Sequence, residues 1–226
     1  MIRAFVSRSL PLLTALALLG GTQACQFNTD TTAATQRLPY LGEPDVVAPG
    51  DTVYPTLPTF TLTNQDRQTV TPATFAGKVY IADFFFATCP SICPKMQSEM
   101  LRVYEKYKND KRVAFLSHTI DPEHDSIPVL REYAERLGVK DASQWHFVTA
   151  PRDTIFRLAG KYMVAAQRDA SAPGGAVHSG AFVLVDPQRH IRGSYDGTNA
   201  EQVDQLLRDL PVLLQEVSGA SATAAK

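Results

Sequence analysis

The run KVYIADFFFA at residues 78–87 constrains the fold of this chain more than any other segment. It is short and almost continuously apolar, which is typical of a β-strand buried on both faces. The next segment, PKMQSEMLRVYEKYKND at 94–110, places Met96, Met100 and Val103 at helical spacing. A doubly buried strand followed at once by an amphipathic helix indicates an α/β domain.

The same alternation continues along the chain. Further strands are predicted at 112–120 and 145–150, and further helices at 126–138 and 152–162. Hairpins are expected at 59–71 and 180–197, the second followed by a final helix that Asn199 would cap. We therefore expect an α/β fold with a central mixed sheet flanked by helices and with an N-terminal hairpin. This order is compatible with a thioredoxin-like fold, although other α/β arrangements share it.

Length and composition limit the organisation to one domain with a substantial core. The chain has 226 residues, of which 44% are hydrophobic and 20% charged. Its formal net charge of −1 gives no electrostatic basis for binding nucleic acid. We expect the domain at 57–217, after a tether and irregular lead-in at 26–56 and before a disordered tail of small residues at 218–226.

The first 25 residues have the form of an export signal. Arg3 and Arg8 precede an apolar run, LPLLTALALLGG, which is too short to span a bilayer at ~20 residues. Cys25 follows a small residue at the expected cleavage point, as in bacterial lipoproteins, although Thr22 stands where leucine is usual. We expect a lipid on Cys25 to anchor an exported protein to the outer, periplasmic side of the inner membrane. Ordinary cleavage would instead leave Cys25 as an incidental thiol.

Cys89 and Cys93 lie in ATCPSICP, just after the predicted buried strand and near the start of the next helix. The partial positive charge of a helix N-terminus stabilises a thiolate, so a lowered pKa is expected. Residues four apart on a helical turn lie about 5–6 Å from each other, which suits either a disulfide or two sulfur ligands on one metal. Spacing alone leaves a redox pair and a metal clamp equally open.

Several other sites fit the pair less well. Two thiolates favour copper(I), and an added imidazole would also accommodate copper(II). A structural zinc site usually needs four protein ligands, and the sequence offers no second cysteine pair. A purely structural disulfide would close a loop of three residues and gain little unfolded-state entropy. The peroxiredoxin pattern P-x-x-x-T-x-x-C precedes neither cysteine.

The chain has five histidines that could supply the imidazole. Four of them fall in predicted strands, a polar loop or a hairpin turn and are expected to be structural or exposed: His118, His146, His124 and His190. His178 follows the small-residue loop DASAPGGAV and precedes the strand GAFVLVD. From there it could reach the rim of the neighbouring strand, where Cys89 would lie. The residues alone leave a structural role for His178 open as well.

Four motifs, in the same order, resemble those of the Sco/SenC family. DFFFATCPSICPKM is similar to the family signature T-x-C-P-x-x-C-P after a strand ending in D-F-x-F. SHTIDPEHDS is similar to S-x-D-P-E-x-D, and HSGAFVLVDPQRHIRGSYDG to the block H-S-x-x-x-x-L-V-D-P. WHFVTA is similar to W-x-F-L-T-G, with Val148 and Ala150 as departures. The resemblance covers residues 57–217.

The resemblance implies a thioredoxin-like fold and one copper ion, as copper(I) or copper(II), bound by Cys89, Cys93 and His178. It also implies a role in assembling the binuclear copper A centre of cytochrome c oxidase subunit II, the expected partner. Asp121 matches the family's D-P aspartate and would lie near the metal, although a turn or cap role would explain it equally well. Asp83 matches a further family position, where a buried aspartate is expected to be hydrogen-bonded, with a structural or redox-tuning role.

Two functions are therefore expected. As a metallochaperone, which is not an enzyme, the protein would pass copper on by ligand exchange. As a thiol–disulfide oxidoreductase, it would use Cys89 and Cys93 to reduce cysteines of the oxidase subunit or of another envelope protein. We favour the metallochaperone and keep the oxidoreductase as the alternative.

Overall fold

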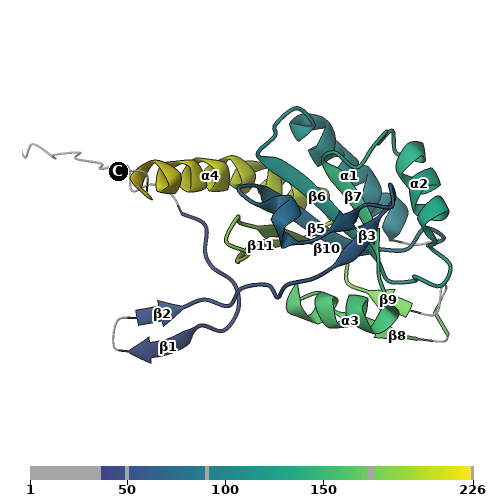
Figure 1. Ribbon diagram of the computed structural model, residues 1–226, viewed down its shortest axis with the longest axis horizontal. Helices are drawn as coiled ribbons and strands as arrows, with labels where there is room; N and C mark the ends of the chain where they lie inside the picture. Colours follow the sequence, from purple (N-terminus) through teal and green to yellow (C-terminus); the bar gives the residue numbers. More distant parts are fainter. Residues whose placement is uncertain (1–36, 49–50, 90–91, 170, 173–175, 225–226) are drawn as a thin grey trace, which may run out of the picture. The chain divides into compact units, whose positions relative to one another are not determined.

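The computed structural model describes residues 37–48, 51–89, 92–169, 171–172 and 176–224. The expected signal, Cys25 and the first part of the tether lie outside these residues. A seven-stranded sheet forms the centre of the domain (Figure 1). Its strands, in spatial order, are β11 (Ile191–Asp196), β10 (Ala181–Val185), β5 (Val79–Phe85), β6 (Val113–Thr119), β7 (Trp145–Thr149), β3 (Leu62–Asn64) and β4 (Thr69–Val70).

The sheet is mixed, as predicted. Strands β5, β6 and β7 pair in parallel at its centre, and both edges are antiparallel. Every residue of β5 and β6 is buried, which explains their nearly continuous apolar sequences. The hairpins expected at 59–71 and 180–197 are β3–β4 and β10–β11. The central mixed sheet and its N-terminal hairpin are therefore confirmed.

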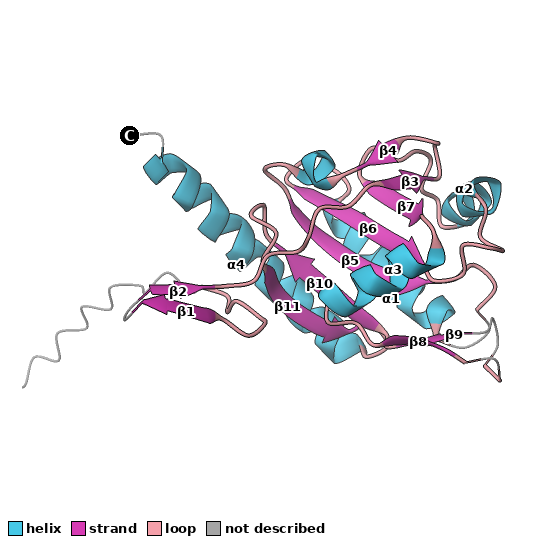
Figure 2. Cartoon of the chain, turned by 60° about the horizontal axis from the view of Figure 1, so that its bottom comes forward, coloured by secondary structure: helices cyan, strands magenta, loops and turns pink. Residues whose placement is uncertain are grey.

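Helices cover both faces of this sheet (Figure 2). They are α1 (Cys93–Tyr107), α2 (Ile127–Arg136), α3 (Arg152–Lys161) and α4 (Ala200–Ala224). Side chains alternate between the two faces along a strand. On one face Asp83 accepts a hydrogen bond from Gln97 of α1, and Phe85 packs on Tyr133 of α2. Helices α1 and α2 therefore share a face, and they lie over the end of β5 from which the cysteine segment emerges.

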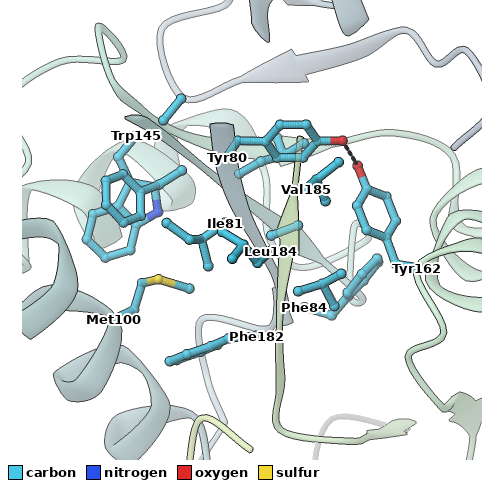
Figure 3. Close-up of a cluster of buried hydrophobic side chains, with 14 of the residues drawn as sticks. Tyr80, Ile81, Phe84, Met100, Trp145, Tyr162, Phe182, Leu184 and Val185 are labelled. Carbon is cyan, nitrogen blue, oxygen red and sulfur yellow. Dashed lines mark hydrogen bonds between the residues drawn. The ribbon is translucent and has the colours of Figure 1, made fainter. Parts of the chain in front are cut away.

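The opposite face packs against the end of α3. The hydroxyls of Tyr80 and Tyr162 lie 3.0 Å apart, and the Phe84 ring meets the Tyr162 ring edge to face (Figure 3). Both tyrosines are almost completely buried, so each hydroxyl needs the partner that the other supplies. Two buried faces leave β5 rigidly held, and this fixes the position of the residues that follow it.

The lead-in before the domain is more ordered than predicted. Arg192, a buried residue of β11, donates hydrogen bonds to the carbonyls of Leu38 at 2.6 Å and Pro39 at 3.1 Å. Leu38 and Pro39 lie in no helix or strand, but these hydrogen bonds tie them to β11. Two exposed strands, β1 (Asp45–Ala48) and β2 (Asp51–Val53), also form a hairpin there.

The final helix also departs from the prediction. Its start agrees, since Asn199 Oδ1 accepts hydrogen bonds from the N–H groups of Glu201 and Gln202. However, α4 continues to Ala224, through residues expected to form a disordered tail. Three of the residues at 218–224 are alanine, the strongest helix former, and none is proline. Within the described residues, no helix has the length and apolar character needed to cross a membrane.

Candidate functional site

Both cysteines lie where the central strand β5 gives way to α1. The N–H of Cys89 donates to the carbonyl of Phe86 at 3.2 Å, and Cys93 is the first residue of the helix. Among the described residues neither cysteine is part of a disulfide, and the two residues are only 8% and 2% exposed. Cys89 therefore lies between β5 and α1, so the distance between residues on one helical turn does not describe the pair. The two side chains nevertheless meet, through a hydrogen bond between their thiols.

The surroundings of Cys93 do not favour a thiolate. Burial raises the pKa of the Cys93 thiol well above its ordinary value, and the hydrogen bond with Cys89 raises the pKa further. Desolvation therefore opposes the lowered pKa that was expected for Cys93 at a helix N-terminus. Two adjacent buried thiols resist losing both protons unless a cation takes the place of those protons.

His178 reaches the thiols from 85 residues further along the chain. Its Nε2 lies 3.5 Å from Cys93 Sγ, and its Nδ1 lies 3.0 Å from the carbonyl oxygen of Ser179. A carbonyl can only accept, so Nδ1 carries the proton and the Nε2 lone pair faces the sulfur. Burial also lowers the pKa of His178. The imidazole is thus neutral and presents a lone pair, as a metal ligand must.

A short hairpin that was not predicted positions His178. The residue ends β9 (Ala176–His178), which pairs with β8 (Ala166–Arg168) and places His178 opposite Ala166. Gly180 lets this segment approach the turn before α4 closely, since a Cβ there would lie 2.9 Å from Thr198 Cγ2, and the Met96 sulfur of α1 would lie 3.4 Å away. Part of the segment expected to be a loop before the strand GAFVLVD therefore forms the strand β9. The pairing of β9 with β8 directs His178 toward Cys93 of α1.

The predicted three-ligand set is only partly assembled. Cys93 contacts both Cys89 and His178. Across the residues that the structure describes, no group of three or more His, Cys, Asp or Glu side chains is placed to hold a metal ion. Copper ligation by all three residues stays a prediction.

Asp121 lies in the loop after β6, where both carboxylate oxygens have partners. Arg152 Nη2 is 3.0 Å from Oδ1, and His124 Nδ1 is 2.8 Å from Oδ2. Asp121 is buried, whereas the His124 side chain is 75% exposed. These contacts give Asp121 a structural role in its loop, and its position near a metal stays a prediction.

Asp125, in the same loop, was not recognised from the sequence. Its Oδ2 accepts a hydrogen bond from the N–H of Ala87 at 3.0 Å and another from the hydroxyl of Thr119. The carboxylate thus ties the turn that leads to Cys89 to the end of β6. In the sequence, Asp125 appeared only as the second aspartate of DPEHD. The family motif S-x-D-P-E-x-D includes this position, but no role was predicted for it.

Asp83 lies beneath the cysteine segment in a buried polar chain, as expected of a hydrogen-bonded aspartate. Gln97 Nε2 donates to Asp83 Oδ2 at 2.9 Å, and the Ser117 hydroxyl donates to Oδ1. Trp145 Nε1 donates to Ser117 Oγ at 2.9 Å. Burial raises the pKa of Asp83 to about 7, and the hydrogen bonds only partly oppose this. The carboxyl can therefore change its charge near neutral pH.

The other histidines have structural contacts. His118 and His146 are buried, as predicted, and burial lowers the pKa of each to about 4. His190 is half-buried rather than exposed, because its ring lies edge-on to Tyr40 and 3.3 Å from Asp186 Oδ2.

Comparison with known proteins gives a consistent result. The SCO1/SenC family model matches residues 50–215. The chain is 29% identical over 153 residues to the SCO1 protein homolog of Bacillus subtilis (strain 168), covering 67% of this chain and 79% of that protein.

Two solved structures share the fold. One is BsSco, a member of the Sco family of cytochrome c oxidase assembly proteins in which a disulfide switch was identified. It has a TM-score of 0.62 and 25% identity, and the match covers 79% of this chain and 98% of BsSco. The other is Arabidopsis thaliana ScoI with copper bound, with a TM-score of 0.60, 22% identity and coverage of 72% and 99%. The thioredoxin-like fold class is thereby confirmed.

Proposed function

Because the chain belongs to the SCO1/SenC family, we propose that it binds one copper ion through Cys89, Cys93 and His178. We further propose that it delivers this copper to the binuclear copper A centre of cytochrome c oxidase subunit II. The observation that carries the proposal is the 3.5 Å contact between His178 Nε2 and Cys93 Sγ, with the imidazole lone pair directed at the thiol.

The chemistry of the donors supports copper. A site that combines thiolates with a neutral imidazole can bind copper in either oxidation state, copper(I) or copper(II). Because burial raises the pKa of the Cys93 thiol, a bound cation would favour its thiolate form. Copper(I) held by two thiolates keeps a low coordination number, which leaves a position for a thiolate of the recipient. The copper-bound structure of Arabidopsis ScoI shows that this fold can carry the metal.

The site of action follows from the N-terminal sequence. Its basic residues, short apolar run and Cys25 support export and a lipid anchor in the cell envelope. We place the domain on the outer face of the inner membrane, where subunit II of the oxidase would be its partner. Mass spectrometry of the membrane-extracted protein tests this, since a diacylated Cys25 would be its first residue.

Copper titration tests the ligand set. The purified protein should bind one copper(II) ion per chain, and His178→Ala should weaken binding by more than about tenfold. His124→Ala is the matched control, because that imidazole is exposed and paired with Asp121. Undiminished copper(II) affinity in His178→Ala would remove the imidazole from the proposal.

A second function is favoured by the two adjacent, hydrogen-bonded thiols and by the disulfide switch known in BsSco. As an oxidoreductase, the protein would attack a disulfide of the partner, pass through a mixed disulfide and release two reduced partner thiols as Cys89 and Cys93 join. Cys93→Ser should then trap the mixed disulfide. Failure to trap it, or a midpoint potential too oxidising to reduce subunit II, would count against this function.

A further inference from the structure

A cleft of about 370 Å³ opens beside the two thiols, between α1 and α2. Cys89 and Cys93 both line it, whereas His178 is not among the described residues that do. Its other walls are largely apolar and include Phe86, Leu101, Tyr133 and Leu137. A molecule in this cleft would therefore reach the sulfurs without crossing the side occupied by the imidazole.

A polar atom in the wall has no hydrogen-bonding partner within the part of the chain that the structure describes. Gln97 lines the cleft and is only 2% exposed. Its Nε2 is committed to Asp83, at 2.9 Å, and this fixes the orientation of the amide. Its Oε1 is buried and has no hydrogen-bond partner among the described residues. Buried acceptors are nearly always paired, so this oxygen has the capacity to accept one further hydrogen bond.

A single charged residue is found among the described lining residues, Arg136 at the rim. Its Nη1 lies 2.8 Å from Glu132, and its guanidinium lies over the Tyr133 ring. Both members of this ion pair are more than half exposed, so the pair is weak and screened by solvent. Arg136 can exchange Glu132 for a carboxylate of an incoming molecule at little cost.

We propose that this cleft binds an extended segment of the partner protein that carries a cysteine, an apolar side chain next to that cysteine and a carboxylate further along. The apolar side chain would contact Leu101 and Leu137, and a backbone N–H would donate to Gln97 Oε1. The carboxylate would pair with Arg136, which holds the partner's sulfur beside Cys89 and Cys93. This inference rests on the proposed function, because it states how a recipient cysteine reaches the thiols.

Two peptide probes test the cleft on the full-length protein. One has the sequence Ala-Cys-Leu-Ala-Glu and the other Ala-Cys-Ser-Ala-Lys, each activated as the mixed disulfide with 5-thio-2-nitrobenzoate. A protein thiolate attacks the peptide sulfur, one disulfide forms as one breaks, and the released thionitrobenzoate is measured by its absorbance. The rate for each peptide is divided by the rate at which free cysteine attacks the same activated peptide. This corrects for any difference in reactivity between the two peptide disulfides.

The apolar, acidic peptide should react about tenfold faster than the polar, basic one, which corresponds to about 1.4 kcal/mol of binding. Arg136→Glu should reverse part of this preference. Ser98→Phe, at an exposed lining residue, should fill the cleft and abolish the preference. Arg208→Glu, an exposed arginine of α4, is the control and should leave the ratio unchanged.

Equal rates for the two peptides would overturn the proposal, as would a preference that survives both Arg136→Glu and Ser98→Phe. Copper binding by the same preparation is measured separately. A protein that keeps the peptide preference but binds no copper would contradict the proposed metallochaperone function and leave the cleft standing. A protein that binds copper but shows no preference would contradict the cleft alone.

Discussion

Replacing Asp83 with Asn should remove a pH-dependent loss of stability. Burial raises the pKa of this carboxyl from 3.8 to about 7, so between these pH values it is protonated in the folded protein and ionised in the unfolded chain. The folded state then binds the extra proton. The contribution of Asp83 to the free energy of unfolding is therefore fully present below pH 4 and is lost as the pH rises to 7.

The size of the effect follows from the pKa. Each tenfold change in an ionisation constant is worth about 1.4 kcal/mol, so a rise from 3.8 to about 7 corresponds to roughly 4 kcal/mol. Asn has nearly the same shape and can still accept a hydrogen bond from the Ser117 hydroxyl. Its amide would face Gln97 Nε2, and rotation of the Gln97 amide would restore that hydrogen bond with Oε1 as the acceptor.

Urea unfolding followed by circular dichroism, from pH 4 to 8 with reductant and a copper chelator, measures the effect. The buried imidazoles of His118 and His146 have pKa values near 4, so they make stability rise with pH up to about 6.5 and partly mask Asp83. The difference between Asp83→Asn and the unmodified protein removes this contribution. That difference should increase by roughly 4 kcal/mol between pH 4 and 8. A difference that does not vary with pH would refute the reasoning.

Substitutions at three other positions test further contacts. Asp125→Ala should cost about 1–3 kcal/mol of stability, since the N–H of Ala87 loses its acceptor. Asp125→Asn should cost less in the same urea assay, and equal losses would contradict this. Arg192→Met should cost about 3–5 kcal/mol because it removes the buried guanidinium that pairs with Asp186 and Glu216, and an unchanged urea midpoint would be the contrary result. Gly180→Ala should lower Tm by the equivalent of about 1–3 kcal/mol, since the new Cβ would lie 2.9 Å from Thr198 Cγ2. An unchanged Tm would mean that Thr198 moves freely.

Much of the fold could be predicted because its signals are local. The apolar run of β5 and the spacing of Met96, Met100 and Val103 each indicate one element without reference to distant residues. The hairpin β1–β2 could not be predicted in this way, because all residues of its strands are exposed. Without a buried face, its sequence shows no alternation of apolar and polar residues. Residues 38–39 are held in place by hydrogen bonds from Arg192, which lies more than 150 residues further along the chain.

The sequence indicated which residues to consider for the candidate site, but it did not indicate how burial would change their pKa values. Cys89 and Cys93 stood out by type and spacing, whereas the resemblance was needed to single out His178. The raised pKa of Cys93 depends on burial that only the packed fold reveals. The hydrogen bond between Asp125 and Ala87 arises because β5 and β6 pair in parallel and end together, with Phe85 beside Thr119. No local pattern encodes that register.

The central claim is that this protein carries copper to an oxidase subunit. The most direct test is an anaerobic copper(I) titration of the purified protein, followed by mixing with a purified fragment of cytochrome c oxidase subunit II. One copper ion should bind per chain and then move to the fragment, measured by the metal content of the separated proteins. Absence of copper(I) binding, or binding without transfer to the fragment, would contradict the account.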